Sequence, residues 1–289
     1  MRQTGAAAAL TFAVLSVTVA GCTSPATEVP SAEAPFVVSH VHAVDLDQRT
    51  GAVYVATHDG VLNVAADGSV ERIGEWAGDV MGMARFGNTI YFSGHPAPDE
   101  NLPPNIGVYE LSVQSGEFAP ISLTGEVDFH SMTIAQSSDG MALAGIDSAT
   151  GQVMVSRDGA QSWAAGMPIG ARSLSWDSNA ERLYATTEQG LLISTDDGMT
   201  FTAADGAPLL VLIASSPADV STEAFLVGTD VDGYVHTSPD GVTWTSSGLA
   251  PPLSDALAVG SDGSIVVAGI EGVHRSEDRG ATWAVITEF

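Results

Sequence analysis

The sequence predicts an all-β protein, a six-bladed β-propeller of four-stranded antiparallel blades. Four copies of a short turn pattern end at Trp163, Phe201, Trp244 and Trp283, at intervals of 38, 43 and 39 residues. Short apolar runs recur at a similar spacing, and the 254 residues from Phe36 to the end supply about 42 residues for each of six blades. A repeat of this length is typical of one propeller blade.

Each expected blade opens with an apolar strand, followed by a turn and a second apolar strand. The second strands are the clearest, because they are short, rich in β-branched and aromatic residues and bounded by turn-forming residues. They are Val53 to Thr57, Ile90 to Gly94, Met141 to Gly145, Leu183 to Thr187, Ala224 to Gly228 and Ile265 to Gly269. The blades are expected at residues 36–77, 78–124, 125–170, 171–207, 208–250 and 251–289. Seven blades remain the alternative if one segment divides differently.

The turn pattern has a mechanical explanation. Its copies read SRDGAQSW from Ser156, STDDGMTF from Ser194, SPDGVTW from Ser238 and SEDRGATW from Ser276. An aspartate at the third position can accept backbone N–H bonds across a tight turn, a glycine relieves a positive φ, and the aromatic residue covers the hairpin. We therefore expect four aspartates to be structural and not catalytic: Asp158, Asp196, Asp240 and Asp278.

These copies resemble the Asp-box, or BNR repeat, of sialidases and many bacterial surface propellers. The phrases HVHAV, ATHDG, SGHP and DFHS, in this order, resemble bacterial extracytoplasmic lipoproteins described as sialidase-like or glycosyl hydrolase-like. The resemblance implies the propeller fold and the repeat. Sialidases bind a substrate carboxylate with three arginines, and only Arg172 is well placed here. The catalytic set of sialidases is therefore not expected.

The N-terminus is typical of an exported lipoprotein. Residues 1–21 are predicted to be a signal peptide, with Arg2 as the positive start, an apolar run too short to span a bilayer, and the sequence VAGC at residues 19–22. That tetrapeptide resembles a bacterial lipobox, which implies that Cys22 is lipidated. Residues 22–35 are expected to be a Pro-rich tether, and residues 36–289 the propeller domain. These features predict an extracytoplasmic protein anchored to the cell membrane.

The net charge of −26, with no lysine, narrows the classes of partner. Nucleic acids and anionic headgroups need clustered cations, so we expect no nucleic-acid binding and membrane contact through the lipid anchor only. An acidic surface is compatible with a metal ion or another small ligand.

Five of the seven histidines are predicted to lie on one rim. The start of a first strand and the end of a second strand share a rim, and first strands line the central channel. This rim should carry His40, His42, His58, His95 and His130, together with Met81 and Met83. Imidazoles and thioethers suit a transition metal: copper if a methionine is a ligand, and zinc if only histidines and a carboxylate are.

Two other functions stay open. A glycoside hydrolase acting on neutral sugars needs paired carboxyl groups. The same rim is expected to carry five as weak catalytic candidates: Asp147, Glu188, Asp230, Asp255 and Glu271. The third hypothesis is an interaction or assembly scaffold with an envelope protein as its partner.

Overall fold

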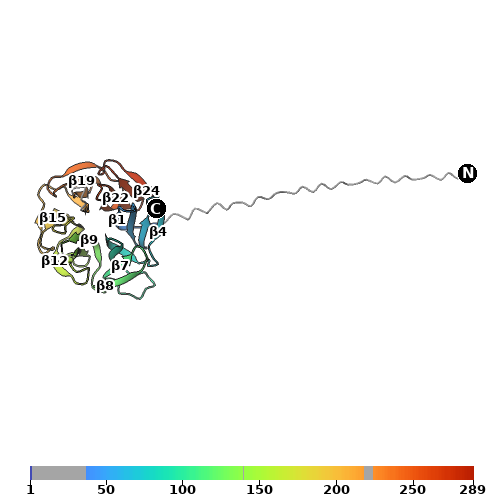
Figure 1. The fold of residues 1–289 in the computed structure, drawn as a ribbon, viewed down its shortest axis with the longest axis horizontal. Helices are drawn as coiled ribbons and strands as arrows, with labels where there is room; N and C mark the ends of the chain where they lie inside the picture. The colour runs from blue at the N-terminus through green and yellow to red at the C-terminus, as the bar shows by residue number, and fades with distance from the viewer. Residues whose placement is uncertain (2–36, 139, 218–223) are drawn as a thin grey trace. The chain divides into compact units, whose positions relative to one another are not determined.

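The structure is a computed structural model that describes Met1 and residues 37–289, except residue 139 and residues 218–223. Residues 2–21 of the predicted signal peptide, Cys22 and the tether lie outside the described residues. Within the described part there is no helix long and apolar enough to cross a membrane. Twenty-four strands form six four-stranded antiparallel sheets arranged as a ring, which confirms the six-bladed β-propeller (Figure 1).

Every blade consists of four strands consecutive in the chain. Blade 1 contains β1 (Val41–Asp47), β2 (Ala52–Thr57), β3 (Gly60–Val64) and β4 (Val70–Arg72), and blade 2 contains β5 (Asp79–Phe86), β6 (Thr89–His95), β7 (Val108–Ser112) and β8 (Phe118–Ser122). Blade 3 contains β9 (Phe129–Ser137), β10 (Gly140–Asp147), β11 (Gln152–Ser156) and β12 (Ala164–Pro168), and blade 4 contains β13 (Ala171–Trp176), β14 (Leu183–Thr187), β15 (Gly190–Ser194) and β16 (Thr202–Ala203). Blade 5 contains β17 (Leu210–Ser215), β18 (Leu226–Asp230), β19 (Tyr234–Ser238) and β20 (Thr245–Leu249), and blade 6 contains β21 (Ser254–Val259), β22 (Ile265–Gly269), β23 (Gly272–Ser276) and β24 (Ala284–Thr287).

Successive first strands pack against one another, and β21 packs against β1 to close the ring. Figure 1 shows β9 near the centre of the ring and β8 and β12 near its outside. The second strands are almost fully buried because both of their faces are covered by neighbouring blades. Continuous apolar runs such as VYVAT and IVVAG follow from this position.

The hydrophobic core consists of six clusters, one at each blade interface. Tyr54 of blade 1 packs with Phe92 of blade 2, for example, and Val53 of blade 1 packs with Val266 of blade 6. At this last interface the Gln48 side chain also donates to Asp262 Oδ1 and accepts from the Ser261 backbone N–H. Side-chain contacts between blades 1 and 6 thus close the ring, and among the described strands no blade contains strands from both ends of the chain.

The four serine–aspartate turns, which begin at Ser156, Ser194, Ser238 and Ser276, join the third and fourth strands of blades 3 to 6. In the second copy the Ser194 hydroxyl donates to Asp196 Oδ1 at 2.8 Å, and Asp196 accepts the Thr200 backbone N–H at 2.9 Å and its hydroxyl at 2.6 Å. The backbone N–H of Met167, in blade 3, donates to Gly198 O of this turn. Hydrogen bonds from the turn hold the pKa of Asp158, Asp240 and Asp278 at about 2, so these carboxylates are acceptors engaged in structure.

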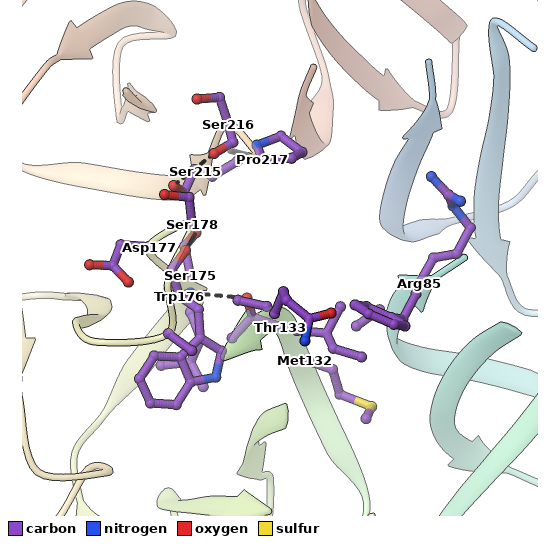
Figure 2. A pocket seen from close by; sticks show the side chains of 18 of the residues that line it. Arg85, Met132, Thr133, Ser175, Trp176, Asp177, Ser178, Ser215, Ser216 and Pro217 are labelled. Atoms are coloured by element: carbon purple, nitrogen blue, oxygen red, sulfur yellow. Dashed lines mark hydrogen bonds between the residues drawn. The ribbon is translucent and has the colours of Figure 1, made fainter. Parts of the chain in front are cut away.

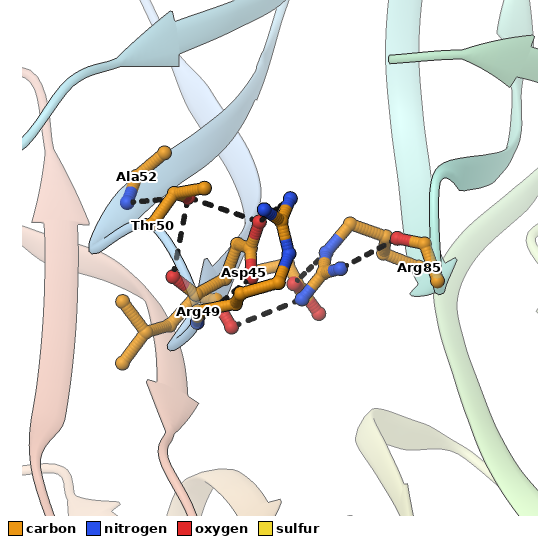
Figure 3. A network of polar contacts seen from close by, with 8 residues as sticks. Asp45, Arg49, Thr50, Ala52 and Arg85 are labelled. Carbon is orange, nitrogen blue, oxygen red and sulfur yellow. Dashed lines mark hydrogen bonds and ion pairs between the residues drawn. The ribbon is translucent and has the colours of Figure 1, made fainter. Parts of the chain in front are cut away.

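A polar contact also joins blades 1 and 2 at the far end of their first strands (Figure 3). Arg85 Nε donates to Asp45 Oδ1 at 2.5 Å, and the same guanidinium donates to Leu46 O and Gly87 O. The guanidinium, the Asp45 carboxylate and these two backbone carbonyls therefore fix the positions of two adjacent first strands.

Candidate metal site

Every first strand carries a β-bulge at its upper end. The register between first and second strand shifts by one residue at this point in all six blades. The residue skipped by the pairing, here called the bulge position, is His42, Met81, His130, Arg172, Val211 and Asp255 in blades 1 to 6. A bulge bends the strand and redirects a side chain. The repeated backbone thus presents six side chains, two of them histidines, around one mouth of the channel.

The first cluster comprises His42, His58 and Asp79. Their ligand atoms lie within 4.8 Å of one another. His42 Nε2 is 3.5 Å from Asp79 Oδ1, and His58 Nε2 is 3.9 Å from Asp79 Oδ2. The two histidines come from the upper ends of β1 and β2, and Asp79 begins β5 of the next blade.

The second cluster comprises His95, Asp128 and His130, again within 4.8 Å of one another. Asp128 Oδ2 lies 2.6 Å from His130 Nε2 and 3.4 Å from His95 Nε2. His95 Nδ1 is 2.7 Å from Pro104 O, and because a carbonyl can only accept, this nitrogen carries the proton. The lone pair of His95 therefore lies on Nε2, which faces the cluster.

Burial shapes the charges of both clusters. Burial, followed by the imidazoles of His58 and His40, lowers the pKa of His42 to about 4. Burial also raises the pKa of the Asp79 carboxyl, and the negative charge of nearby Asp128 raises it further. Burial opposes ionisation of Asp128, but the hydrogen bond and charge of His130 outweigh it and lower the Asp128 pKa. The hydrogen bond to Asp128 raises the pKa of His130.

Three polar atoms show that these clusters fit a cation. His42 Nε2, Asp79 Oδ1 and Asp128 Oδ1 are buried and have no hydrogen-bond partner. A buried acceptor without a partner is costly, and a metal ion in each cluster would satisfy these atoms. Each cluster offers two imidazoles and one carboxylate, a donor set that suits zinc and leaves a coordination position open.

Asp79 and Asp128 were not among the residues predicted from the sequence. Both stand two residues before a bulge position, and Asp79 pairs directly with His95 across the strands. This spacing is the signal that could have identified them, since DVM and DFH carry the aspartate at the same offset.

The structure does not bring all of the predicted metal residues together. His40 is exposed and stacks on His58 at 5.0 Å between ring centroids, outside both clusters. Met81 is half-buried at the bulge position between those of His42 and His130. Met83 is 4 % exposed and packs in the core with Phe92, while also bordering the channel.

Two of the five carboxylates considered for glycosidase chemistry, Asp230 and Asp255, line the same cavity. Asp147 accepts the Thr150 hydroxyl at 2.6 Å and Asp230 accepts from His236 at 2.8 Å, so both have structural partners. Glu188 and Glu271 are exposed. Asp255 lines the cavities at the channel mouth.

Three cavities surround the channel. One of about 90 Å³ is lined by His42, His130, Arg172 and Asp255, and a second of about 560 Å³ adjoins it at Arg172 and Asp255. The largest, about 1110 Å³, opens at the other end of the first strands, where Figure 2 shows Arg85 across the opening from Ser175, Ser178 and Ser215. Apart from Met83, none of the predicted metal residues lines it.

Comparisons with known proteins show the fold alone. No protein-family profile matches the chain, and no curated protein matches it. PorZ, a surface component of the type-IX secretion system of Porphyromonas gingivalis, has 12% identity and a TM-score of 0.53 over 86% of this chain and 32% of its own. An ancestral GH74 enzyme has 17% identity and a TM-score of 0.56 over 88% and 39%.

A chain of the nidogen/laminin complex is similar over 80% of this chain and 91% of its own, with 12% identity and a TM-score of 0.61. The chain spans about a third of the length of PorZ and somewhat more of the GH74 enzyme. At these identities the similarity supports the propeller architecture, and activity must be argued from the site.

Proposed function

We propose that this protein is a lipid-anchored, extracytoplasmic β-propeller that binds transition-metal ions at its channel mouth, one ion in each cluster. The observation that carries the proposal is the pair of His–His–Asp clusters with buried acceptor atoms lacking partners. Zinc is the proposed ion because neither cluster contains a thioether. Met81, at the intervening bulge position, makes copper the alternative.

Three protein ligands in each cluster would leave room for water or an exogenous ligand. The Pro104 carbonyl would orient His95 of the second cluster, since a hydrogen bond to the other ring atom fixes imidazole orientation and tautomer. Burial keeps His42 uncharged down to about pH 4, so its lone pair is available at neutral pH.

Metal analysis of protein prepared without a polyhistidine tag tests this function. Wild-type protein dialysed against zinc should retain two equivalents per chain, the Asp79→Asn and Asp128→Asn variants fewer, and the His42→Ala/His130→Ala double variant none. The matched control is His236→Ala/His274→Ala, which removes two imidazoles outside the clusters and should retain both equivalents. Equal zinc in the wild type and the His42→Ala/His130→Ala variant would reject the site.

The anchor is tested separately. The lipobox-like sequence at residues 19–22 supports lipidation at Cys22, and the similarity to PorZ, a surface component, supports an extracytoplasmic address. Cys22→Ser should move the protein from the membrane to the soluble fraction of cells. Unchanged membrane association would contradict lipid anchoring.

A glycoside hydrolase is the second candidate, supported by the similarity to the GH74 enzyme and by Asp255 in the cavity wall. It would hydrolyse arylglycosides without added metal, and Asp255→Asn would abolish this activity. Unchanged hydrolysis in that variant would exclude Asp255 from the reaction.

A further inference from the structure

Arg172 is one of four described arginines without a carboxylate partner, and it is the one that lines the two cavities at the channel mouth. Acidic residues outnumber arginines 35 to 9, and Arg49, Arg85, Arg157 and Arg275 all form ion pairs with carboxylates. Arg172 is exposed and has neither a hydrogen bond nor an ion pair with any described residue. In such an acidic surface, a cation without a counter-charge is available to bind an anion.

The backbone places Arg172 beside the two clusters. It occupies the bulge position of blade 4, next along the ring from His130 in blade 3. Arg172, His42 and His130 line the same cavity of about 90 Å³, which is small enough for one group to face all three.

The adjoining cavity supplies space for the rest of a ligand. Its volume is about 560 Å³, and its wall combines apolar residues such as Leu249, Pro251 and Leu253 with the acidic Asp230 and Asp255. Arg172 lines both cavities and so stands at the junction between them. A ligand held at Arg172 could place its charged end toward the clusters and its body away from them.

We propose that this mouth binds a phosphate monoester, with the phosphate group held jointly by Arg172 and the metal ions of the two clusters. The inference rests on the proposed metal function, because the two aspartates would repel an anion if the clusters held no metal. Phosphate is favoured over carboxylate because its oxygens can face three cationic points at once, and arginine binds phosphate oxygens in a bidentate manner. The organic part of the ester would occupy the cavity of about 560 Å³.

Titration calorimetry with phenyl phosphate tests the inference on zinc-loaded protein after removal of free metal. Arg172→Gln should keep its zinc and lose affinity for phenyl phosphate by about tenfold to hundredfold, the usual range for a hydrogen bond to a charged group. Arg49→Gln is the matched control, since it removes the same charge from a β1–β2 turn at the opposite rim and should bind like the wild type. Chelation of zinc should abolish binding.

Each failure has its own meaning. Absence of bound zinc would refute the proposed function and with it the premise of this inference. Zinc binding without phenyl phosphate binding, or equal affinity in wild type and Arg172→Gln, would overturn the inference alone. Benzoate shares the ring but carries a carboxylate, so tighter binding of benzoate than of phenyl phosphate would overturn the choice of phosphate. Tighter binding of phenyl phosphate than of inorganic phosphate is expected, and the reverse would remove the second cavity from the site.

Discussion

Burial of His42 should make the stability of the metal-free protein fall between pH 6.5 and pH 4. Burial, with His58 and His40, lowers the pKa of His42 from 6.5 to about 4 in the folded protein. The unfolded chain takes up a proton here below pH 6.5, whereas the folded protein does not until about pH 4. Because the unfolded state then binds more protons, the free energy of unfolding decreases as the pH falls through this window.

The size of the effect follows from the two pKa values. A pKa lowered from 6.5 to about 4 corresponds to a loss of about 3.4 kcal/mol once the pH is below 4. The same linkage gives a loss of about 1.4 kcal/mol at pH 5.5 and about 2.6 kcal/mol at pH 4.5. The His42 side chain retains 16% of its exposure, so solvent screening reduces these values only modestly.

Urea unfolding of chelator-treated protein at several pH values measures this loss. His42→Asn should lose less stability than the wild type on acidification, with each protein referred to its own value near neutral pH. Asp79, whose raised pKa acts in the opposite sense, is present in both proteins and does not create the difference. His40→Asn removes one of the smaller causes of the lowered His42 pKa, so its loss should lie between those of the wild type and His42→Asn. Parallel curves for His42→Asn and the wild type would refute the reasoning.

Three further predictions concern the stability of the propeller and zinc release from the second cluster. Replacing Arg85 with Met leaves Asp45 without its ion-pair partner and should lower the free energy of unfolding by about 3–5 kcal/mol. Urea unfolding measures this loss, and a loss below about 1 kcal/mol would contradict a structural role for the pair. Asp196→Ala removes acceptors of a serine–aspartate turn and should lower the urea midpoint in the same assay, whereas an unchanged midpoint would show that the turn is dispensable. Because pairing with Asp128 raises the pKa of His130, zinc at the second cluster should be released at a higher pH than zinc at the first. Calorimetry at several pH values, on variants that each retain one cluster, measures the pH at which each cluster releases zinc. Release from the first cluster at the higher pH would contradict this prediction.

The fold could be predicted because two features of the sequence repeat at the spacing of the blades, the turn pattern and the apolar second strand. The turn pattern recurs in blades 3 to 6, and the buried second strands recur in all six, where coverage on both faces demands continuous apolar runs. The six sheets fall inside the six predicted ranges, including blades 1 and 2, where the turn pattern is missing and strand spacing was the only guide.

The site could be predicted only in part, because strand periodicity does not reveal bulges. Alternation placed Met81 and Met83 on one face, but the bulge in β5 separates their surroundings, and Met83 enters the core. Acidic residues are common in this chain, so nothing in composition distinguishes Asp79 from the others. Its role becomes visible only when the bulge register is known.

The two clusters follow one rule of the repeat. In each blade the residue just before the bulge position pairs with a second-strand residue. The next residue of that second strand meets the residue two before the bulge position of the following blade, which gives His58 with Asp79 and His95 with Asp128. At the other four interfaces, all within the described residues, these positions carry other pairs. They are Ser148 with Gly170, Glu188 with Leu209, Val231 with Leu253, and Ile270 with His40. Only two interfaces therefore combine an imidazole with a carboxylate. A bulge-position histidine completes each set, from blade 1 in the first cluster and from blade 3 in the second, so blade 2 lies between two ligand sets and contributes to both.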